Sequence, residues 1–330
     1  MSNTSDSKHE RSAALYDGEL TLDLFYGELT DTLAKVYVRA AAVGLEGAHL
    51  TGTVRGPACE LAQTLAFDVT LVPAPNAAEG DSALLAMATL PDPCPWTPEL
   101  PMVYEVAVQV TGESGKLLFE AKRSLGLRPL GPRGKDLLLD GRRWVMRGAR
   151  AKHIEGALES GNDTSADEID AWREAHAICV VNNPSDAFCA AASRRGVMLV
   201  VMLDAEDRNQ AEGQLRRLAR WPAVGIVALP SKSPVEETIR QAAPNALLAE
   251  FVQAGDESVT TDHNVAAWAD VVLCEGGAAA IGQLSLDRTI PLLGLRSSDQ
   301  TYADVAEARA ACDSFQAELA PFGDFAGYLL

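Results

Sequence analysis

Apolar and polar residues follow one pattern up to about residue 130 and a different pattern after it. In the first part, apolar and polar residues alternate within short runs, as in residues 20–25 and 103–108. Alternation of this kind indicates strands with one face buried. In the second part, runs such as residues 197–203 are apolar throughout. Continuous apolar runs are typical of parallel strands that are buried on both faces, so the two parts predict two different kinds of sheet.

The first part contains seven β-rich runs separated by turns: residues 19–27, 34–43, 48–54, 64–72, 83–90, 103–110 and 116–125. Seven short strands at this spacing predict an immunoglobulin-like β-sandwich. The proline-rich residues 91–95 cannot form a central strand and are expected to form a loop that crosses between the sheets. Trp96, which follows them, is interpreted either as an exposed ring for sugar stacking or as a packed core residue, and the packed alternative is favoured.

The second part contains eight apolar runs: residues 144–148, 177–182, 197–203, 224–229, 246–251, 270–274, 290–295 and 325–330. Helical signals lie between them, with expected helices up to Glu174, at residues 187–195, at 206–220 and at 302–319. Ser185 is expected to cap the start of the second of these helices, and Gly196 is expected to end it. Strands that alternate with helices in this way predict a small (β/α)8 TIM barrel. The sequence thus predicts an immunoglobulin-like β-sandwich followed by a small TIM barrel.

An Asp140-Gly141 pair between two short apolar runs predicts a tight hairpin, because both residue types tolerate positive φ angles. This hairpin is placed between the two domains. The predicted organisation is a disordered polar tail at residues 1–18, the sandwich at 19–130 and the barrel at 131–330. The three leucines at 137–139 are expected to be buried at or beside the junction of the domains.

Three stretches match a known family in order and spacing. Residues 95–104 read PWTPELPMVY, residues 126–128 read GLR, and residues 139–148 read LDGRRWVMRG. They resemble, in turn, a late segment of the sandwich, its closing segment and the first barrel strand of family 2 glycoside hydrolases, the β-galactosidase, β-glucuronidase and β-mannosidase group. The resemblance covers about residues 19–330, and the family's separate sugar-binding domain, which normally precedes the sandwich, has no counterpart.

The resemblance also implies where two catalytic carboxyl groups would stand. In the family, an Asn-Glu pair with the acid follows the fourth barrel strand, and the nucleophile Glu ends the seventh. Residues 220–232 match the fourth-strand segment, but Ser231 stands at the Asn position and Lys232 at the acid position. At the end of the seventh strand, Arg296 or Leu295 falls at the nucleophile position. Since lysine does not replace a proton-donating Glu, we expect a barrel that has lost hydrolysis.

Other carboxylates are fallback candidates for catalysis: Glu275 after the sixth strand, Glu250 in the fifth and Asp204 after the third. For each of them, an ordinary loop or barrel-lining role is the favoured interpretation. The five histidines show no metal-site spacing, and neither a P-loop nor a GxGxxG motif occurs. We therefore expect no metal and no cofactor.

Several polar residues are predicted to lie at the barrel mouth. Arg150, Lys152, Lys232 and Arg296 would bring positive charge there, and Asn182 and Asn183 follow the second strand. If this end binds something, we expect an anionic small molecule or an acidic segment of a protein partner.

Composition narrows the choice of partners. The net charge of −18 argues against nucleic acid and against an anionic membrane surface. The six cysteines show no paired spacing, and the first residues form no signal peptide, so we expect a cytoplasmic protein with reduced cysteines. The oligomeric state is left open.

Two hypotheses about function remain open. The first is a non-catalytic binding or scaffold protein that is similar to family 2 glycoside hydrolases. The second is an active glycosidase that uses Glu275, Glu250 or Asp204. Two carboxyl groups about 5 Å apart at the barrel mouth, or about 6.5 to 9.5 Å apart for an inverting enzyme, would favour the second.

Overall fold

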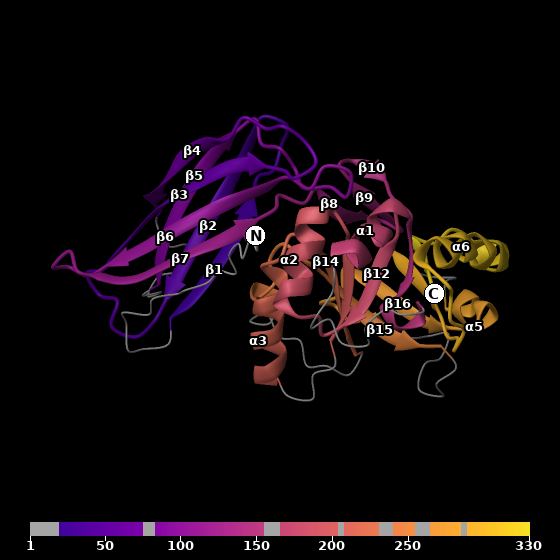
Figure 1. The fold of residues 1–330 in the computed structure, drawn as a ribbon. Helices are drawn as coiled ribbons and strands as arrows, with labels where there is room; N and C mark the ends of the chain where they lie inside the picture. The colour runs from indigo at the N-terminus through magenta and orange to yellow at the C-terminus, as the bar shows by residue number, and fades with distance from the viewer. Residues whose placement is uncertain are drawn as a thin grey trace, which may run out of the picture. The chain divides into compact units, whose positions relative to one another are not determined.

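A computed structural model describes residues 20–74, 83–154, 166–203, 208–230, 240–254, 265–284 and 289–330 (Figure 1). The predicted tail, Asp204, Ser231 and Lys232 lie outside these residues. The chain divides into two compact units. The first contains the strands before Leu127, and the second contains residues from Arg128 onward together with two earlier segments, Cys59–Ala62 and Pro95–Pro101.

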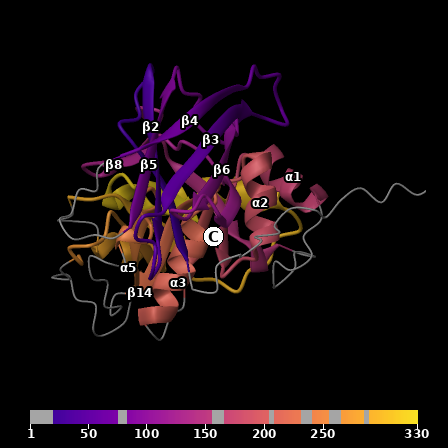
Figure 2. The same cartoon turned by 90° about the vertical axis from the view of Figure 1, so that its left-hand side faces the viewer.

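The first unit is a sandwich-like arrangement of seven antiparallel strands in the order β1-β2-β5-β4-β3-β6-β7. The strands are β1 Thr21–Gly27, β2 Leu33–Ala41, β3 His49–Ala58, β4 Phe67–Pro73, β5 Leu84–Pro91, β6 Val103–Thr111 and β7 Leu117–Leu125. Each overlaps one of the seven predicted runs. Strand β4 pairs along β3 but touches β5 at only two positions, so β1, β2 and β5 form one layer and the other strands a second. In Figure 2, β2 and β5 lie beside each other, and β3, β4 and β6 form the neighbouring group.

Alternation explains this unit's core. Along β2, every second residue is buried, and the buried set includes Val36 and Val38. These side chains pack with Leu90, Tyr104 and Val106 from the other strands in one apolar cluster. The loop between β5 and β6 begins after Pro91, as its prolines predict.

A three-stranded sheet opens the second unit. It consists of β8 Leu130–Arg133, β9 Asp136–Leu139 and β10 Arg142–Arg143 in the order β10-β9-β8. Strands β9 and β10 form the predicted hairpin, and its turn residues Asp140 and Gly141 have φ angles of 51° and 71°. Two consecutive positive φ angles are what a type I′ turn requires. Leu137 and Leu139 are buried, whereas Leu138 is half-buried.

Eight parallel strands then close into a barrel, which confirms the eight predicted strands and their closure. They are β11 Met146–Arg150, β12 Ile178–Asn182, β13 Leu199–Met202, β14 Val224–Pro230, β15 Leu247–Gln253, β16 Val271–Gly276, β17 Leu292–Arg296 and β18 Gly327–Leu329. Each overlaps one predicted run. The barrel closes because β18 pairs with both β17 and β11.

Helices connect the barrel strands: α1 Ala166–Glu174, α2 Asp186–Arg195, α3 Arg208–Ala219, α5 Ala278–Gln283 and α6 Val305–Leu319, with short 3-10 helices η1 Ala151–His153 and η2 Ala320–Phe322. They follow β11, β12, β13, β16 and β17. Ser185 caps α2 as predicted, since its side chain accepts a hydrogen bond from the Phe188 amide. Gly196 ends the same helix with a φ of 79°. Helix α5 was not predicted, because it has only six residues.

Trp96 belongs to the second unit and is fully buried, with 0% of its surface exposed. Its indole nitrogen donates a hydrogen bond of 2.9 Å to the Ser193 carbonyl in α2. The packed interpretation of this residue is therefore correct, and sugar stacking on Trp96 is excluded.

Candidate functional site

The barrel mouth, formed by the C-terminal ends of the eight strands, is the place where such barrels carry their sites. Arg150 ends β11 and Glu275 lies near the end of β16, on strands that are separated by β17 and β18. The Arg150 Nη1 atom nevertheless lies 2.6 Å from Glu275 Oε1. Strands this far apart in the sheet can touch only across the barrel, so both side chains point into its interior.

This ion pair is largely withdrawn from solvent. The exposed fractions of the two side chains are 10% for Arg150 and 13% for Glu275. The second terminal nitrogen of Arg150 lies 3.8 Å from the sulfur of Met202, which ends β13. Arg150 therefore spans the interior at the mouth, between a carboxylate from one side of the barrel and a thioether from another.

The strand pairing shows which other side chains share this interior face. Successive side chains of a strand point to opposite faces, and paired residues of neighbouring strands point to the same face. Glu275 pairs with Leu295 of β17 and with Gln253 of β15, so both lie on the interior face. Leu295 is therefore the interior residue at the end of the seventh barrel strand, where the resemblance implies a nucleophile.

Arg296 lies on the opposite face, which differs from the expectation that it adds charge to the mouth. Its guanidinium pairs with Glu318 and lies over the Phe315 ring, with 4.7 Å to the ring centroid. Both partners belong to α6. The reason is register: Gly294, two residues earlier, faces the same helix, because a Cβ added there would meet Phe315 and Leu319.

Glu250 also lies outside the interior. Its neighbour Ala249 pairs with Val271, which shares the face of Glu275, so Glu250 points the other way. The side chain is 1% exposed, and its Oε2 atom accepts a hydrogen bond of 2.9 Å from the Ala266 amide, in the connection between β15 and β16. This fallback candidate is thus a buried acceptor on the outer face of the barrel, away from the mouth.

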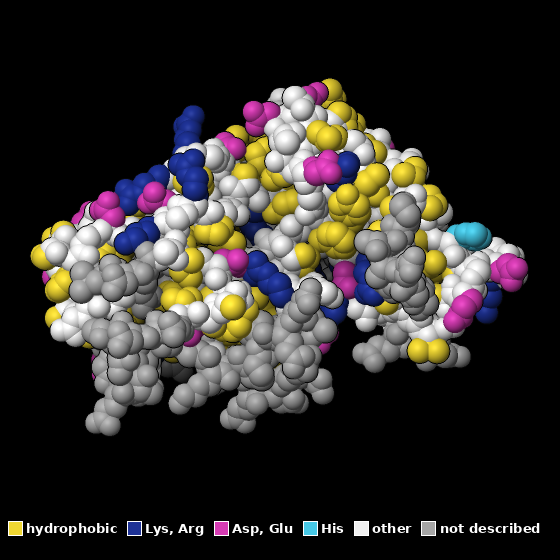
Figure 3. Space-filling view, turned by 180° about the vertical axis from the view of Figure 1, so that it is seen from behind, with side chains coloured by type: hydrophobic (Ala, Val, Ile, Leu, Met, Phe, Trp, Pro, Cys, Tyr) yellow, Lys and Arg dark blue, Asp and Glu magenta, His cyan; other side chains and the backbone are white. Residues whose placement is uncertain are grey.

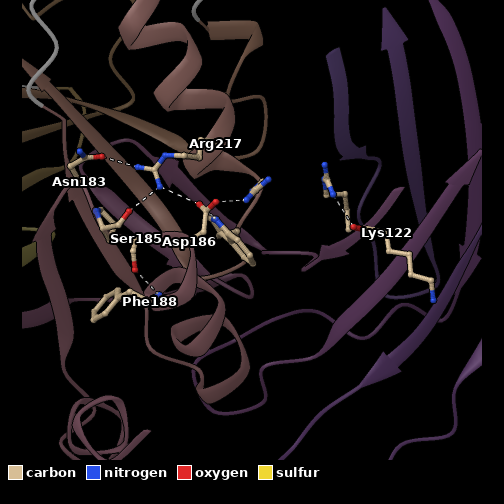
Figure 4. Close-up of polar contacts among 10 residues, drawn as sticks. Lys122, Asn183, Ser185, Asp186, Phe188 and Arg217 are labelled. Carbon is tan, nitrogen blue, oxygen red and sulfur yellow. Dashed lines mark hydrogen bonds and ion pairs between the residues drawn. The ribbon is translucent and has the colours of Figure 1, made fainter. Parts of the chain in front are cut away.

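The two asparagines at the end of β12, Asn182 within it and Asn183 just after it, have different surroundings. Asn182 pairs with Met202 on the interior face and is exposed. Asn183 has a φ of 40°, and its side-chain oxygen accepts a hydrogen bond of 2.7 Å from Arg217 of α3 (Figure 4). Arg217 also donates to the Pro184 carbonyl at 2.9 Å. Asn182 can therefore meet a ligand, whereas Asn183 fixes its own loop.

The carboxylate of Asp186 holds the same loop to the end of α3. It accepts hydrogen bonds from Arg217 at 3.1 Å, from Arg220 at 2.6 Å and from the Trp221 indole at 3.1 Å (Figure 4). With its acceptor oxygens engaged by three donors, this carboxylate has a structural role.

Lys152 and His153 follow Arg150 in the 3-10 helix η1. Lys152 is exposed, whereas His153 is buried. Burial lowers the pKa of His153 below its ordinary value, and the charges of Lys152 and Arg150 lower it further. Asp299 and Glu275 act on the His153 pKa in the opposite direction. These groups are therefore electrostatically coupled beside the ion pair.

Sequence reasoning missed several residues of this site: Met202, Gln253, Asp299 and Tyr302. Gln253 could have been predicted from the sequence. The fifth run ends at residue 251, and because side chains of a strand alternate between two faces, Gln253 shares the face of residue 251. Met202 and Tyr302 carry no chemical signal of their own. Only the three-dimensional arrangement brings them to the mouth.

Two further features of the described residues concern metal sites and membrane-spanning helices. In the part of the chain that the structure describes, no group of three or more His, Cys, Asp or Glu residues is arranged to hold a metal ion. No helix among the same residues is long and apolar enough to span a membrane. Figure 3 shows basic and acidic side chains interspersed on one face of the molecule.

Comparisons with known proteins reveal similarity in structure. No protein-family model and no curated protein matches the chain. Among solved structures, Bacteroides uniformis β-glucuronidase 2 has a TM-score of 0.60 at 14% identity, covering 94% of this chain and 45% of that chain. A glycosyl hydrolase family 2 member from Bacteroides cellulosilyticus has a TM-score of 0.62 at 13% identity, with 96% and 43% covered.

Bifidobacterium dentium β-glucuronidase, solved with coumarin-3-O-glucuronide, has a TM-score of 0.63 at 13% identity, covering 95% of this chain and 61% of that chain. This chain therefore spans less than two thirds of the length of each of these three structures. At this identity, the similarity concerns the fold. The resemblance to family 2 glycoside hydrolases is thus confirmed at the level of the fold, which this chain shares with their β-glucuronidases.

Proposed function

We propose that the first unit is an immunoglobulin-like sandwich and that the second is a small (β/α)8 barrel. The strand order β1-β2-β5 beside β4-β3-β6-β7 supports the first assignment. Tyr104, near the start of β6, accepts a hydrogen bond of 2.8 Å from the Cys94 amide, in the manner of the tyrosine corner of such sandwiches. In the part of the chain that the structure describes, helices follow β11, β12, β13, β16 and β17, and they support the second assignment.

We further propose that the barrel has lost glycoside hydrolysis and acts as a non-catalytic binding or scaffold protein. The observation that carries this proposal is the Arg150–Glu275 ion pair of 2.6 Å inside the mouth. Retaining hydrolysis needs one carboxyl group that donates a proton and a second, about 5 Å away, that attacks the sugar. Glu275 is held by a cation, and Leu295 is the neighbouring interior residue on β17.

The environment of the pair supports a structural role for Glu275. The Arg150 guanidinium engages Oε1 of this carboxylate where both side chains are mostly buried, and breaking a pair of this kind is costly. The degenerate positions Ser231 and Lys232 belong to the same proposal on the basis of the sequence resemblance.

The experiment is a hydrolysis assay on nitrophenyl β-galactoside, β-glucuronide and β-mannoside. The β-glucuronide is included because solved structures of similar fold are β-glucuronidases. We expect no turnover by the wild-type protein. Turnover that disappears in a Glu275→Gln variant would overturn the proposal.

That outcome would favour the second candidate function, an active glycosidase. The observation in its favour is that Glu275 does lie on the interior face of the mouth. Of the two other candidates, Glu250 points away from the interior, and Asp204 lies outside the described residues.

We propose that the ligand at the mouth is an anionic small molecule or an acidic segment of a protein partner. Lys152, Asn182 and Gln253 are exposed there and supply the donors for such a ligand. Because Arg150 and Arg296 are each paired with a carboxylate, Lys152 supplies the attraction for anions among the mouth residues that the structure describes. Calorimetry that detected a neutral oligosaccharide and no anionic analogue would contradict this proposal.

We also propose a cytoplasmic location, without nucleic acid or a membrane as partner. None of the six cysteines forms a disulfide, which suits a reducing compartment. The net charge of −18 disfavours both kinds of polyanionic surface.

A further inference from the structure

The segment after β11, residues 151–154, is hydrogen-bonded to the segment after β17 at Tyr302. The Tyr302 amide donates a hydrogen bond of 2.7 Å to the His153 carbonyl, and Ile154 and Tyr302 form a parallel bridge. Both Ile154 and Tyr302 are buried. Residues 151–154, named here the latch segment, directly follow Arg150 and are held to the segment after β17 by this hydrogen bond and this bridge. We call this arrangement the closed state.

His153 is the titratable group enclosed by this closure. Only 5% of its surface is exposed. Two cations, Lys152 and Arg150, and two carboxylates, Asp299 and Glu275, are the charged groups that act on it among the described residues. Lys152 belongs to the latch segment, and Arg150 ends β11 just before it. Asp299 follows β17, and Glu275 lies near the end of β16.

Lowering the pH shifts the equilibrium of the latch segment from the closed state towards the open state. In the closed state, burial and the two cations hold the pKa of His153 below the ordinary value of 6.5. If the segment opens, the imidazole is exposed to water and its pKa rises towards that value. The open state therefore binds a proton more readily, and closure weakens as the pH falls below about 6.5. Above that pH, His153 is neutral in both states and closure is unaffected.

We propose that residues 151–154 form an acid-sensitive latch on the barrel mouth: protonation of His153 releases the contact with Tyr302 and opens access to the Arg150–Glu275 pair. The latch deepens the binding role proposed for the mouth, and in that sense it rests on the proposed function. Its test involves no ligand, so the latch and the binding proposal can fail separately.

The experiment is hydrogen–deuterium exchange of the full chain at about pH 7.5 and about pH 5.5, corrected for the chemical exchange rate of free amides, around the midpoint expected for an ordinary histidine. We expect protection of the Ile154 and Tyr302 amides to fall several-fold at the lower pH. Each unit by which the two pKa values differ multiplies the opening equilibrium tenfold. A His153→Gln variant should lose this pH dependence, whereas His49→Gln, which removes an exposed histidine of the first unit, should retain it.

Two surface variants keep the test informative if His153→Gln does not fold. Lys152→Gln removes a cation that opposes protonation in the closed state, so acid should open the latch less than in the wild type. Asp299→Asn removes a carboxylate that favours protonation in the closed state, so acid should open it more. Protection that is independent of pH in the wild type, or variants that shift in the same direction, would overturn the proposal.

Discussion

At the scale of single residues, the Arg150–Glu275 pair is a mostly buried ion pair inside the mouth. Both side chains are mostly buried, so each charge depends on the other for compensation. Removing one partner of a buried pair leaves an uncompensated charge, whereas replacing both partners by apolar residues of similar volume can be nearly neutral. We therefore expect substitutions of Arg150 and of Glu275 to have strongly non-additive effects on the free energy of unfolding.

We predict that Glu275→Leu lowers the free energy of unfolding by roughly 3–5 kcal/mol, because it leaves Arg150 without its carboxylate. The double variant Arg150→Met/Glu275→Leu should lose much less. Urea denaturation with a double-mutant cycle measures both. As a control, Glu318→Ala breaks the half-exposed pair with Arg296 on the outer face and should cost less than about 1 kcal/mol. Additive effects of the two mouth substitutions would contradict the proposed coupling.

Tyr104 provides a pH-dependent prediction in the first unit. Burial raises the pKa of its phenol to about 12, above the ordinary value of 10.0. Because the folded state holds this proton more tightly than the unfolded state, its contribution is complete below pH 10 and is lost as the pH rises towards 12. We expect the difference in stability between the wild type and Tyr104→Phe to shrink over that window in chemical denaturation. A constant difference would count against the assignment.

At the scale of elements, glycines show where backbone conformation decides the fold. Gly196 ends α2 in the left-handed region, and a Cβ added there would lie 2.2 Å from the Pro98 carbonyl oxygen. Gly213, in the middle of α3, has no atom within 4 Å of the equivalent position. The backbone therefore requires glycine at position 196, whereas position 213 has room for a side chain.

We predict that Gly196→Ala destabilises the protein by more than about 1 kcal/mol, through both backbone strain and the clash with Pro98. Gly213→Ala should stabilise it by about 0.5–1 kcal/mol, because alanine loses less backbone entropy in a helix. Thermal unfolding of both variants decides the matter. If both raised or both lowered the melting temperature, the assigned backbone roles would be wrong.

The elements themselves were largely predictable from sequence. Alternation located the seven strands of the first unit, and continuous apolar runs located the eight barrel strands, since burial on one or two faces imposes these patterns directly. The Asp140-Gly141 turn and the Gly196 helix end followed from residues that tolerate positive φ. Boundaries shifted by a few residues where tertiary hydrogen bonds extend or shorten a strand.

The mouth was less predictable, because it depends on which face each strand end presents. A shift of one residue exchanges interior and exterior, and this is why Arg296 faces α6 while Leu295 faces the interior. Likewise, nothing in the sequence indicated that Arg150 would meet Glu275 across the barrel, since 125 residues separate them. Such a pairing exists only once the strands have closed.

At the scale of the whole molecule, the fold resembles that of solved β-glucuronidases. A fold is compatible with many functions, so the site decides between them. We propose that an interior carboxylate paired with Arg150, with Leu295 on the interior face beside it, serves binding rather than hydrolysis.

The most direct test is covalent labelling with cyclophellitol-6-carboxylate aziridine, to which Bacteroides uniformis β-glucuronidase 2 is covalently bound in its solved structure. This reagent reports whether a carboxylate at the mouth can attack a sugar-like ring. We predict that intact mass spectrometry finds this protein unmodified under conditions that fully label an active β-glucuronidase. A mass increase of one reagent molecule, mapped to Glu275 and absent in Glu275→Gln, would contradict the loss of hydrolysis.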